Sequence, residues 1–246
     1  MTTTQTAPVF KPDATPNRFL SGADWSDPRY RTLMREMAVI YRDEMRGQPH
    51  PFGARNPESI VTHWSREWEY PWAVINAEAR FGMHIVDLGC GGSPLLPYLS
   101  RRVGCICTGV EVNFISPTGK HTLRGFAQDP SVAYPEITWL RESMAELSLA
   151  DQSQDRVLCI SVMEHVEPAV ARATLAETYR VLRPGGRALL TTDVDGEHRT
   201  LTSTYEDLLA MGLEAGLELR APMNTTRPTS SPGTYDVVGF VLHRPA

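Results

Sequence analysis

The sequence lacks any apolar run that approaches the length needed to cross a lipid bilayer. Its first 17 residues are polar and lack the apolar centre of a secretory signal peptide. We therefore expect a cytoplasmic protein with no membrane partner, and we expect residues 1–17 to form a mobile tail. Internal repeats are also missing, which argues against a repeat architecture.

Cysteine is scarce, with four residues at positions 90, 105, 107 and 159 of 246. They lie in apolar, strand-like runs or in a glycine-rich turn, and none forms a CxxC pair with a second cluster of metal ligands. This pattern argues against a zinc site. We expect four reduced cysteines in the core.

An excess of basic residues is absent, because 24 Lys and Arg stand against 29 Asp and Glu, for a net charge of −5. This balance disfavours a broad electrostatic grip on nucleic acid or on an anionic membrane, although it leaves room for a local basic patch. A small-molecule partner is favoured. With 41% hydrophobic and 22% charged residues, the chain suits one sizeable domain with an appended helical segment.

The most informative stretch that is present runs from residue 84 to residue 94. The β-branched residues Ile85 and Val86 indicate a buried strand, the glycines that follow indicate a tight turn, and Pro94 suits the first turn of a helix. Gly89 and Gly91 allow a ligand to lie on the main chain. The helix start favours an anionic group, and an acid at the strand's end accepts from a cationic one, so an amino acid moiety fits both.

The motif at 87–91, Asp-Leu-Gly-Cys-Gly, resembles the first motif of class I S-adenosylmethionine-dependent methyltransferases. The resemblance implies S-adenosylmethionine as cofactor, held by Asp87, Gly89, Cys90 and Gly91. Ser93 stands where a third glycine is usual, and we expect its small side chain to be tolerated. The G-x-G-x-x-G spacing of dinucleotide-binding turns is absent. A strand, turn and helix in some other α/β protein remains the alternative.

Residues 18–82 are predicted to be helical. One amphipathic helix is expected from Pro28 to Gly47, a second from Pro57 to a kink or end at Pro71, and a third over 72–81. We expect this segment to form a lid over the substrate region. The aromatic residues concentrated there are candidate substrate contacts, with core packing as the alternative: Trp64, Trp68, Tyr70 and Trp72.

From residue 83 onward, strands and helices alternate. The predicted fold is α/β, a doubly wound, mostly parallel seven-stranded sheet with flanking helices and an N-terminal helical extension, in which 83–246 is the cofactor-binding domain. The predicted strands are 83–88, 105–112, 137–141, 156–162, 187–192, 217–221 and 235–243. The predicted helices are 94–102, a short one near 123–128, 168–182, and one that begins at a capping box of Ser203 and Glu206 and ends at Gly216.

Two further stretches match this family in the expected order. Glu111 ends the second strand, where a carboxylate accepts from both ribose hydroxyls of an adenosyl group. The stretch after 141 is similar to the family's adenine-contacting loop. Ser143 stands where many members carry an aspartate that binds the adenine. We therefore expect Ser143, the backbone N–H of Met144 and apolar contacts to hold the adenine, with Glu142 as an alternative to Ser143.

Residues 161–166, Ser-Val-Met-Glu-His-Val, resemble the segment after the fourth strand in small-molecule methyltransferases of the ubiquinone-biosynthesis type. The resemblance places Ser161 at the cofactor. His165 titrates near neutrality and could take a proton from a hydroxyl acceptor, while Glu164 could orient it or contact substrate. Alternatively, His165 packs beneath the helix that begins at Pro168.

The chemistry implied is an in-line displacement in which an acceptor lone pair attacks the methyl carbon of a sulfonium. Asn-Pro-Pro-Tyr-like and Pro-Cys motifs are absent, which disfavours methylation of DNA and of protein glutamine and favours an O, N, S or C atom of a small molecule. The alternatives are an RNA methyltransferase and a cofactor-binding protein with a regulatory or non-methylating role. Asp193, Asp195 and His198 could gather a divalent metal, but such loops are more often turns, so we expect none.

Overall fold

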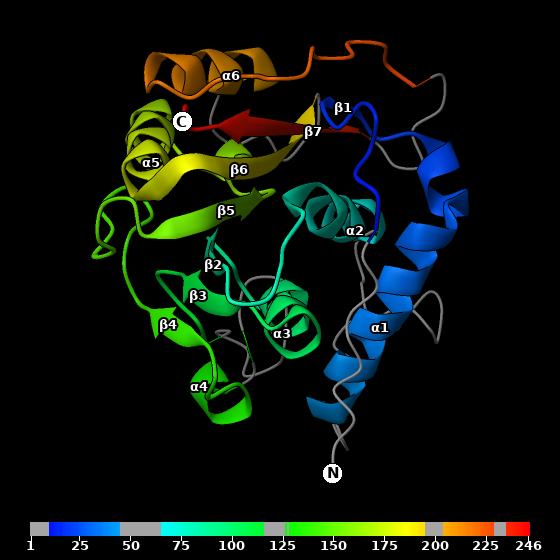
Figure 1. Cartoon of the computed structure of the whole chain (residues 1–246), viewed down its shortest axis with the longest axis vertical. Coiled ribbons are helices and arrows are strands. Elements are labelled where there is room, and N and C mark those ends of the chain that lie inside the picture. Colours follow the sequence, from blue (N-terminus) through cyan, green and yellow to red (C-terminus); the bar gives the residue numbers. More distant parts are fainter. Residues whose placement is uncertain (1–9, 45–64, 116–125, 127, 195–203, 229–234) are drawn as a thin grey trace.

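A single seven-stranded sheet forms the centre of the molecule in the computed structural model, which describes residues 10–44, 65–115, 126, 128–194, 204–228 and 235–246 (Figure 1). The strand order is β1-β7-β6-β5-β2-β3-β4. The strands are β1 (Arg18–Phe19), β2 (His84–Leu88), β3 (Ile106–Val110), β4 (Thr138–Leu140), β5 (Gln154–Ile160), β6 (Leu182–Val194) and β7 (Asp236–His243). The predicted doubly wound α/β fold is confirmed.

The chain reverses its direction of travel across the sheet beside β2. From β2 it proceeds through β3 to β4 on one side, and from β5 through β6 to β7 on the other. The pairs β2–β3, β2–β5, β3–β4 and β5–β6 are parallel, and β7 is antiparallel to both of its neighbours. Open α/β sheets bind ligands beyond the carboxyl ends of the strands at such a switch point.

Helices cover both faces of the sheet. One face carries α1 (Pro28–Glu44), α2 (Arg66–Ala77) and α3 (Leu95–Tyr98), and the other carries α5 (Pro168–Val181) and α6 (Tyr205–Glu214). Figure 1 shows α5 and α6 together on one side of the molecule, and α1 beside α2 on the other. Side chains alternate between the faces: Ile85 and Cys107 pack toward α2, and Val86 and Val110 pack toward α5.

The helix around Pro71 differs from the prediction. Instead of ending there, α2 continues through Pro71 to Ala77. Nearly the whole helix is buried, and this packing outweighs the loss of one backbone hydrogen bond. The predicted third helix over 72–81 is therefore the second half of α2, which ends where Glu78 adopts a left-handed conformation with φ 47°.

Two predictions near the C-terminus were wrong. Residues 217–221 do not form a strand, since Glu218 makes only an isolated bridge to His243, and β1 occupies the remaining place in the sheet. A two-residue strand leaves no periodic signal in the sequence. The capping box of α6 lies one residue later than predicted, with Thr204 accepting from Asp207 N at 3.1 Å and Asp207 accepting from Thr204 N at 2.9 Å.

The end of the predicted tail contacts the body of the protein. Asn17 is 1% exposed, and its side chain donates to Ala221 O at 2.6 Å and accepts from Val241 N at 2.7 Å. Trp72 Nε1 donates to Pro16 O at 2.9 Å. Residues 16 and 17 are therefore tied to α2 and β7.

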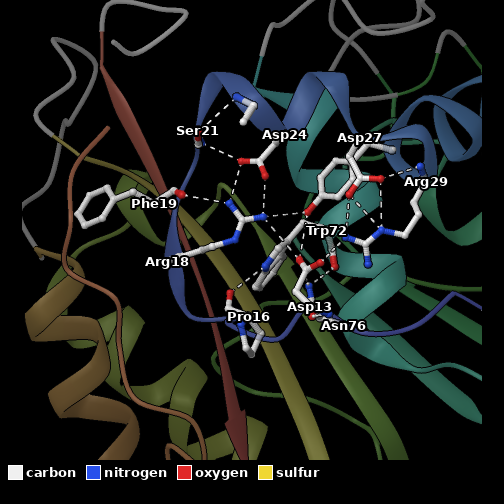
Figure 2. A network of polar contacts seen from close by, with 12 residues as sticks. Asp13, Pro16, Arg18, Phe19, Ser21, Asp24, Asp27, Arg29, Trp72 and Asn76 are labelled. Atoms are coloured by element: carbon white, nitrogen blue, oxygen red, sulfur yellow. Dashed lines mark hydrogen bonds and ion pairs between the residues drawn. The ribbon is translucent and has the colours of Figure 1, made fainter. Parts of the chain in front are cut away.

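A polar network, which we call the N-terminal clasp, joins the first described residues to α2 (Figure 2). Arg18 makes a bidentate pair with Asp24, with both N···O distances 2.7 Å. Asp13 accepts from Arg29 at 2.8 Å and from Tyr30 and Asn76 at 3.2 Å. Because Asn76 belongs to α2, the clasp fixes that helix against the chain that enters β1.

All four cysteines are buried and unpaired, as predicted. In the part of the chain that the structure describes, no helix has both the length and the apolarity to cross a membrane. The short helix expected near 123–128 lies mostly outside the described residues. The short helix α4 (Pro130–Ala133) follows it, in a region that gave no clear pattern.

Candidate active site

The glycine turn after β2 lies at the switch point of the sheet and carries no side chain at Gly89 or Gly91. Gly89 and Gly91 both lie in the left-handed region, with φ +67° and +50°. A Cβ on Gly89 would lie 2.7 Å from the side chain of Val162, so only glycine fits there. Gly89 N and Cys90 N donate to Val110 O at 2.8 and 3.1 Å, which fixes the turn against the end of β3.

Two carboxyl groups lie at the ends of the neighbouring strands β2 and β3. Asp87 is 2% exposed, and burial, together with the nearby charge of Glu111, raises its pKa to about 8. Glu111 directly follows β3, and its carboxylate accepts from Asn113 N at 3.2 Å. The two predicted acids thus flank the glycine turn, one buried and one half-buried.

The predicted adenine loop lies after β4, the next strand in the sheet. Ser143 is exposed, and its hydroxyl accepts from Ala145 N at 3.2 Å, while Met144 is buried. The loop is anchored where Leu147 N donates to Glu177 of α5 at 2.8 Å. Because β3 and β4 are parallel neighbours, Ser143 and Met144 lie at the same edge of the sheet as Glu111, beyond the carboxyl ends of the two strands.

A buried polar cluster joins α2 to the ends of β5 and β6. The Oε1 atom of Glu69 accepts from Ser161 Oγ at 2.5 Å and from Thr191 Oγ1 at 2.6 Å, and its Oε2 atom pairs with Arg66. Burial by itself would raise the pKa of Glu69, but Arg66 and the two hydroxyl donors lower it below its usual range. Ser161 has φ +51°, so the chain leaves β5 in a strained conformation that this cluster stabilises.

Sequence reasoning identified Ser161 but missed Glu69, Arg66 and Thr191. The only available signal was an acid in the first turn of an aromatic-rich helix. Nothing in the sequence shows which strands that helix contacts.

Glu164 and His165 occupy a short 3-10 helix, Met163–His165, directly after β5, and differ in exposure. Glu164 is 1% exposed, whereas His165 is exposed. Glu164 Oε1 accepts from Asp193 N at 3.4 Å. Burial and then the charge of Asp193 raise the pKa of Glu164 to about 8, and burial and then the charge of Glu69 raise that of Asp193 to about 7.

The predicted substrate aromatics are largely core residues. Trp68 and Trp72 are completely buried and stack with ring centroids 5.6 Å apart. They pack on β7 at Gly239, where a Cβ would lie 2.8 Å from Trp72. Tyr70, also buried, shares a side-chain hydrogen bond with Ser93, so the serine that replaces the third glycine helps to attach α2 to the glycine turn. Trp64 lies outside the described residues.

For the metal ligands considered in the sequence, the structure describes only Asp193. Asp195 and His198 lie outside the described residues. Among the residues that are described, no group of three His, Cys, Asp or Glu side chains is arranged to hold a metal ion.

Residues 86–190, which contain the glycine turn, Glu111 and the Glu164 segment, match the family model described as a methyltransferase domain. The strand order of the sheet is consistent with this match, and solved structures of methyltransferases share the fold. The matched residues contain the glycine turn and the ends of β3 and β5, so this part of the chain resembles a methyltransferase domain.

The chain is similar to two curated ubiquinone biosynthesis O-methyltransferases. It is 28% identical to that of Aeromonas salmonicida over 61% of this chain and 55% of the relative, and 33% identical to that of Alkalilimnicola ehrlichii over 45% and 42%. It thus spans about half the length of the curated relatives it matches. Among solved structures, the 1,6-didemethyltoxoflavin-N1-methyltransferase of Burkholderia thailandensis shares the fold, with a TM-score of 0.55, 16% identity, and coverage of 87% of this chain and 91% of that one.

Proposed function

We propose that this chain binds S-adenosylmethionine at the carboxyl ends of β2 and β3 and transfers its methyl group to a small-molecule acceptor. The observation that carries the proposal is the bare glycine turn between two carboxyl groups, with Gly89 and Gly91 left-handed and Asp87 and Glu111 at adjacent strand ends. Relatives named as O-methyltransferases support the same activity.

The residues present fit this cofactor. A carboxyl group as buried as Asp87 gains a favourable partner in a cationic amino group, and the start of α3 favours a carboxylate. In this proposal Glu111 accepts hydrogen bonds from the ribose hydroxyls, and Ser143 and Met144 contact the adenine. Cys90, in the glycine turn, and Ser161, directly after β5, also contact the cofactor. When bound, the cofactor supplies an electrophilic methyl group on a sulfonium.

The acceptor site lies beyond β5 and β6 in this proposal. Glu164 contacts the acceptor from its buried position, and the exposed His165 takes a proton from the acceptor where that acceptor is a hydroxyl group. Helix α2 covers this end of the sheet through Arg66, Glu69 and Tyr70, with Trp68 and Trp72 supporting it from the core. Alignment and exclusion of water by these residues supply the remaining catalysis.

Isothermal titration calorimetry with S-adenosylmethionine and S-adenosylhomocysteine tests the proposal. We expect one-to-one binding of both. Glu111→Ala should weaken it by about 1.5–3 kcal/mol, the value of hydrogen bonds to a charged acceptor. Glu218→Ala removes an exposed carboxylate elsewhere and should leave binding unchanged. Absence of binding by the unaltered protein contradicts the proposal.

The base is tested separately, once an acceptor has been found by screening metabolite pools for label from methyl-labelled cofactor. His165→Ala should keep cofactor binding and, with a hydroxyl acceptor, lose on the order of a hundredfold in turnover. Near-normal turnover by this variant would contradict the role of His165 as a base and would mean that catalysis depends on the alignment of acceptor and cofactor alone. Retention of RNA at low salt would favour an RNA methyltransferase, and cofactor binding without labelling of any pool would favour a regulatory role.

A further inference from the structure

Two acidic side chains at the ends of β5 and β6 each have a buried oxygen that has no hydrogen-bond partner in the part of the chain that the structure describes. These atoms are Glu164 Oε2 and Asp193 Oδ1. The two residues, which we call the carboxyl pair, are joined where Asp193 N donates to Glu164 Oε1 at 3.4 Å. Glu164 is 1% exposed, so its second oxygen has lost contact with water. A carboxylate oxygen in this state is costly, and no described residue donates a hydrogen bond to either of these two atoms.

The charges around the carboxyl pair are unbalanced. From α2, Arg66 and Glu69 face it, and Tyr235 shares a hydrogen bond with Asp193. Arg66 is already engaged by Glu69. Among the described residues, Glu69 adds a third carboxyl group to the two of the pair, and Arg66 supplies the one guanidinium that acts on them. Negative charge is therefore in excess at this site. The pKa values of about 8 and about 7 are consistent with a pair that shares a proton near neutral pH.

We propose that the carboxyl pair binds a cationic amino group of the acceptor, so that the substrate class of this enzyme is an amine. This inference rests on the proposed function. An ammonium group brings three donors and a positive charge to two unpartnered oxygens. A hydroxyl group brings one donor and no charge, and a carboxylate would be repelled.

The same pair prepares the nitrogen for reaction. Binding of the ammonium group releases the shared proton of the pair to solvent, and one proton of the ammonium group then passes to one of the two carboxylates. This leaves a neutral amine with a free lone pair, one carboxylic acid and one carboxylate. A group that titrates near neutral pH is suited to this exchange. The free carboxylate of the pair continues to accept from the remaining N–H groups.

The test measures binding of three probes of equal chain length, n-butylammonium, n-butanol and butyrate, to the protein saturated with S-adenosylhomocysteine. We expect n-butylammonium to bind most tightly, and its affinity to rise from about pH 6 to about pH 9, as the pair ionises while the amine stays protonated. Glu164→Gln should weaken it about tenfold or more, and Glu218→Gln, the same change at an exposed carboxylate, should have no effect.

Equal affinity for butanol, absence of ammonium binding at tens of millimolar, or unchanged affinity in Glu164→Gln would overturn the inference. If Glu164→Gln does not fold, Asp193→Asn and the pH dependence of the unaltered protein provide the same test. Calorimetry with S-adenosylhomocysteine alone separates the two proposals. Cofactor binding without ammonium preference overturns only the inference, whereas an ammonium site without cofactor binding overturns the proposed function.

Discussion

Gly91 and Asp87 contribute to the site through properties of single residues, a backbone dihedral angle and a buried charge. Gly91 lies in the left-handed region, with φ +50°, and has no side chain beside the end of β2. A side chain there would both strain the turn and occupy the space where we place the cofactor.

Gly91→Leu is therefore expected to abolish binding of S-adenosylhomocysteine, measured by calorimetry. Gly185→Ala is a matched control, because Gly185 is also left-handed, with φ +78°, but has open space around it. Both variants should lose roughly 1–2 kcal/mol of stability through backbone strain. Only Gly91→Leu should lose binding, and retained binding by that variant would contradict the site.

The raised pKa of Asp87 predicts an unusual pH dependence of stability. In the unfolded chain an aspartate titrates near about 3.9, whereas in the folded protein the pKa of Asp87 is about 8. Between these values the folded state holds a proton that the unfolded state has released. The contribution of Asp87 to stability is therefore fully present below about pH 4, falls as the pH rises, and levels off above about pH 8.

Urea unfolding of the ligand-free protein from about pH 5 to about pH 8.5 tests this prediction. Asp87→Asn should reduce, by on the order of a few kcal/mol, the decline that the unaltered protein shows. The remaining decline belongs to Glu164 and Asp193, whose pKa values are also raised. Asp151→Asn, at a carboxyl with 73% side-chain exposure, should leave the decline in place. A wild-type slope in Asp87→Asn would show that Asp87 is ionised in the folded protein.

At the scale of elements, the site depends on how α2 meets the sheet. Glu69 is completely buried and connects α2 to β5 through Ser161 and to β6 through Thr191. Tyr70 connects the same helix to the glycine turn through Ser93. The position of α2 therefore sets the geometry at three strand ends at once.

Glu69→Gln should cost about 3–5 kcal/mol of unfolding free energy, because it leaves Arg66 partly buried without its ionic partner. Replacing both residues, as Glu69→Gln with Arg66→Met, should recover part of this loss. Glu67→Gln makes the same chemical change on the same helix at a half-buried position and should have a smaller effect. Chemical denaturation measures all three. Equal losses for Glu67→Gln and Glu69→Gln would contradict the anchoring role.

At the scale of the whole molecule, the N-terminal segment is part of one core. Side chains of α1 and α2 pack with those of β2, β5 and β6 in a single hydrophobic cluster that includes Trp68, Trp72 and Leu189. β1 extends the same sheet, and the N-terminal clasp holds the entering chain against α2 (Figure 2).

A fragment that begins at Gly82 is therefore expected to lack cooperative unfolding, because one face of the sheet would lose its cover. Thermal unfolding followed by near-ultraviolet circular dichroism, with the full chain as reference, measures this. A cooperative transition in the fragment would show that residues 18–82 are an appended segment, as their sequence suggests.

The sequence by itself determined the class of fold and the residues that we propose bind the cofactor. Strand and helix periodicities, the glycines at 89 and 91, and acids at the ends of successive strands are local signals, and parallel strands bring their carboxyl ends to the same edge. Tertiary structure decided the rest. A two-residue strand, the continuation of α2 through Pro71, and the meeting of Glu69 with Ser161 and Thr191 depend on contacts between segments far apart in sequence, which no local pattern encodes. The carboxyl pair belongs to the same group, since Glu164 and Asp193 become neighbours only because β5 and β6 pair in parallel.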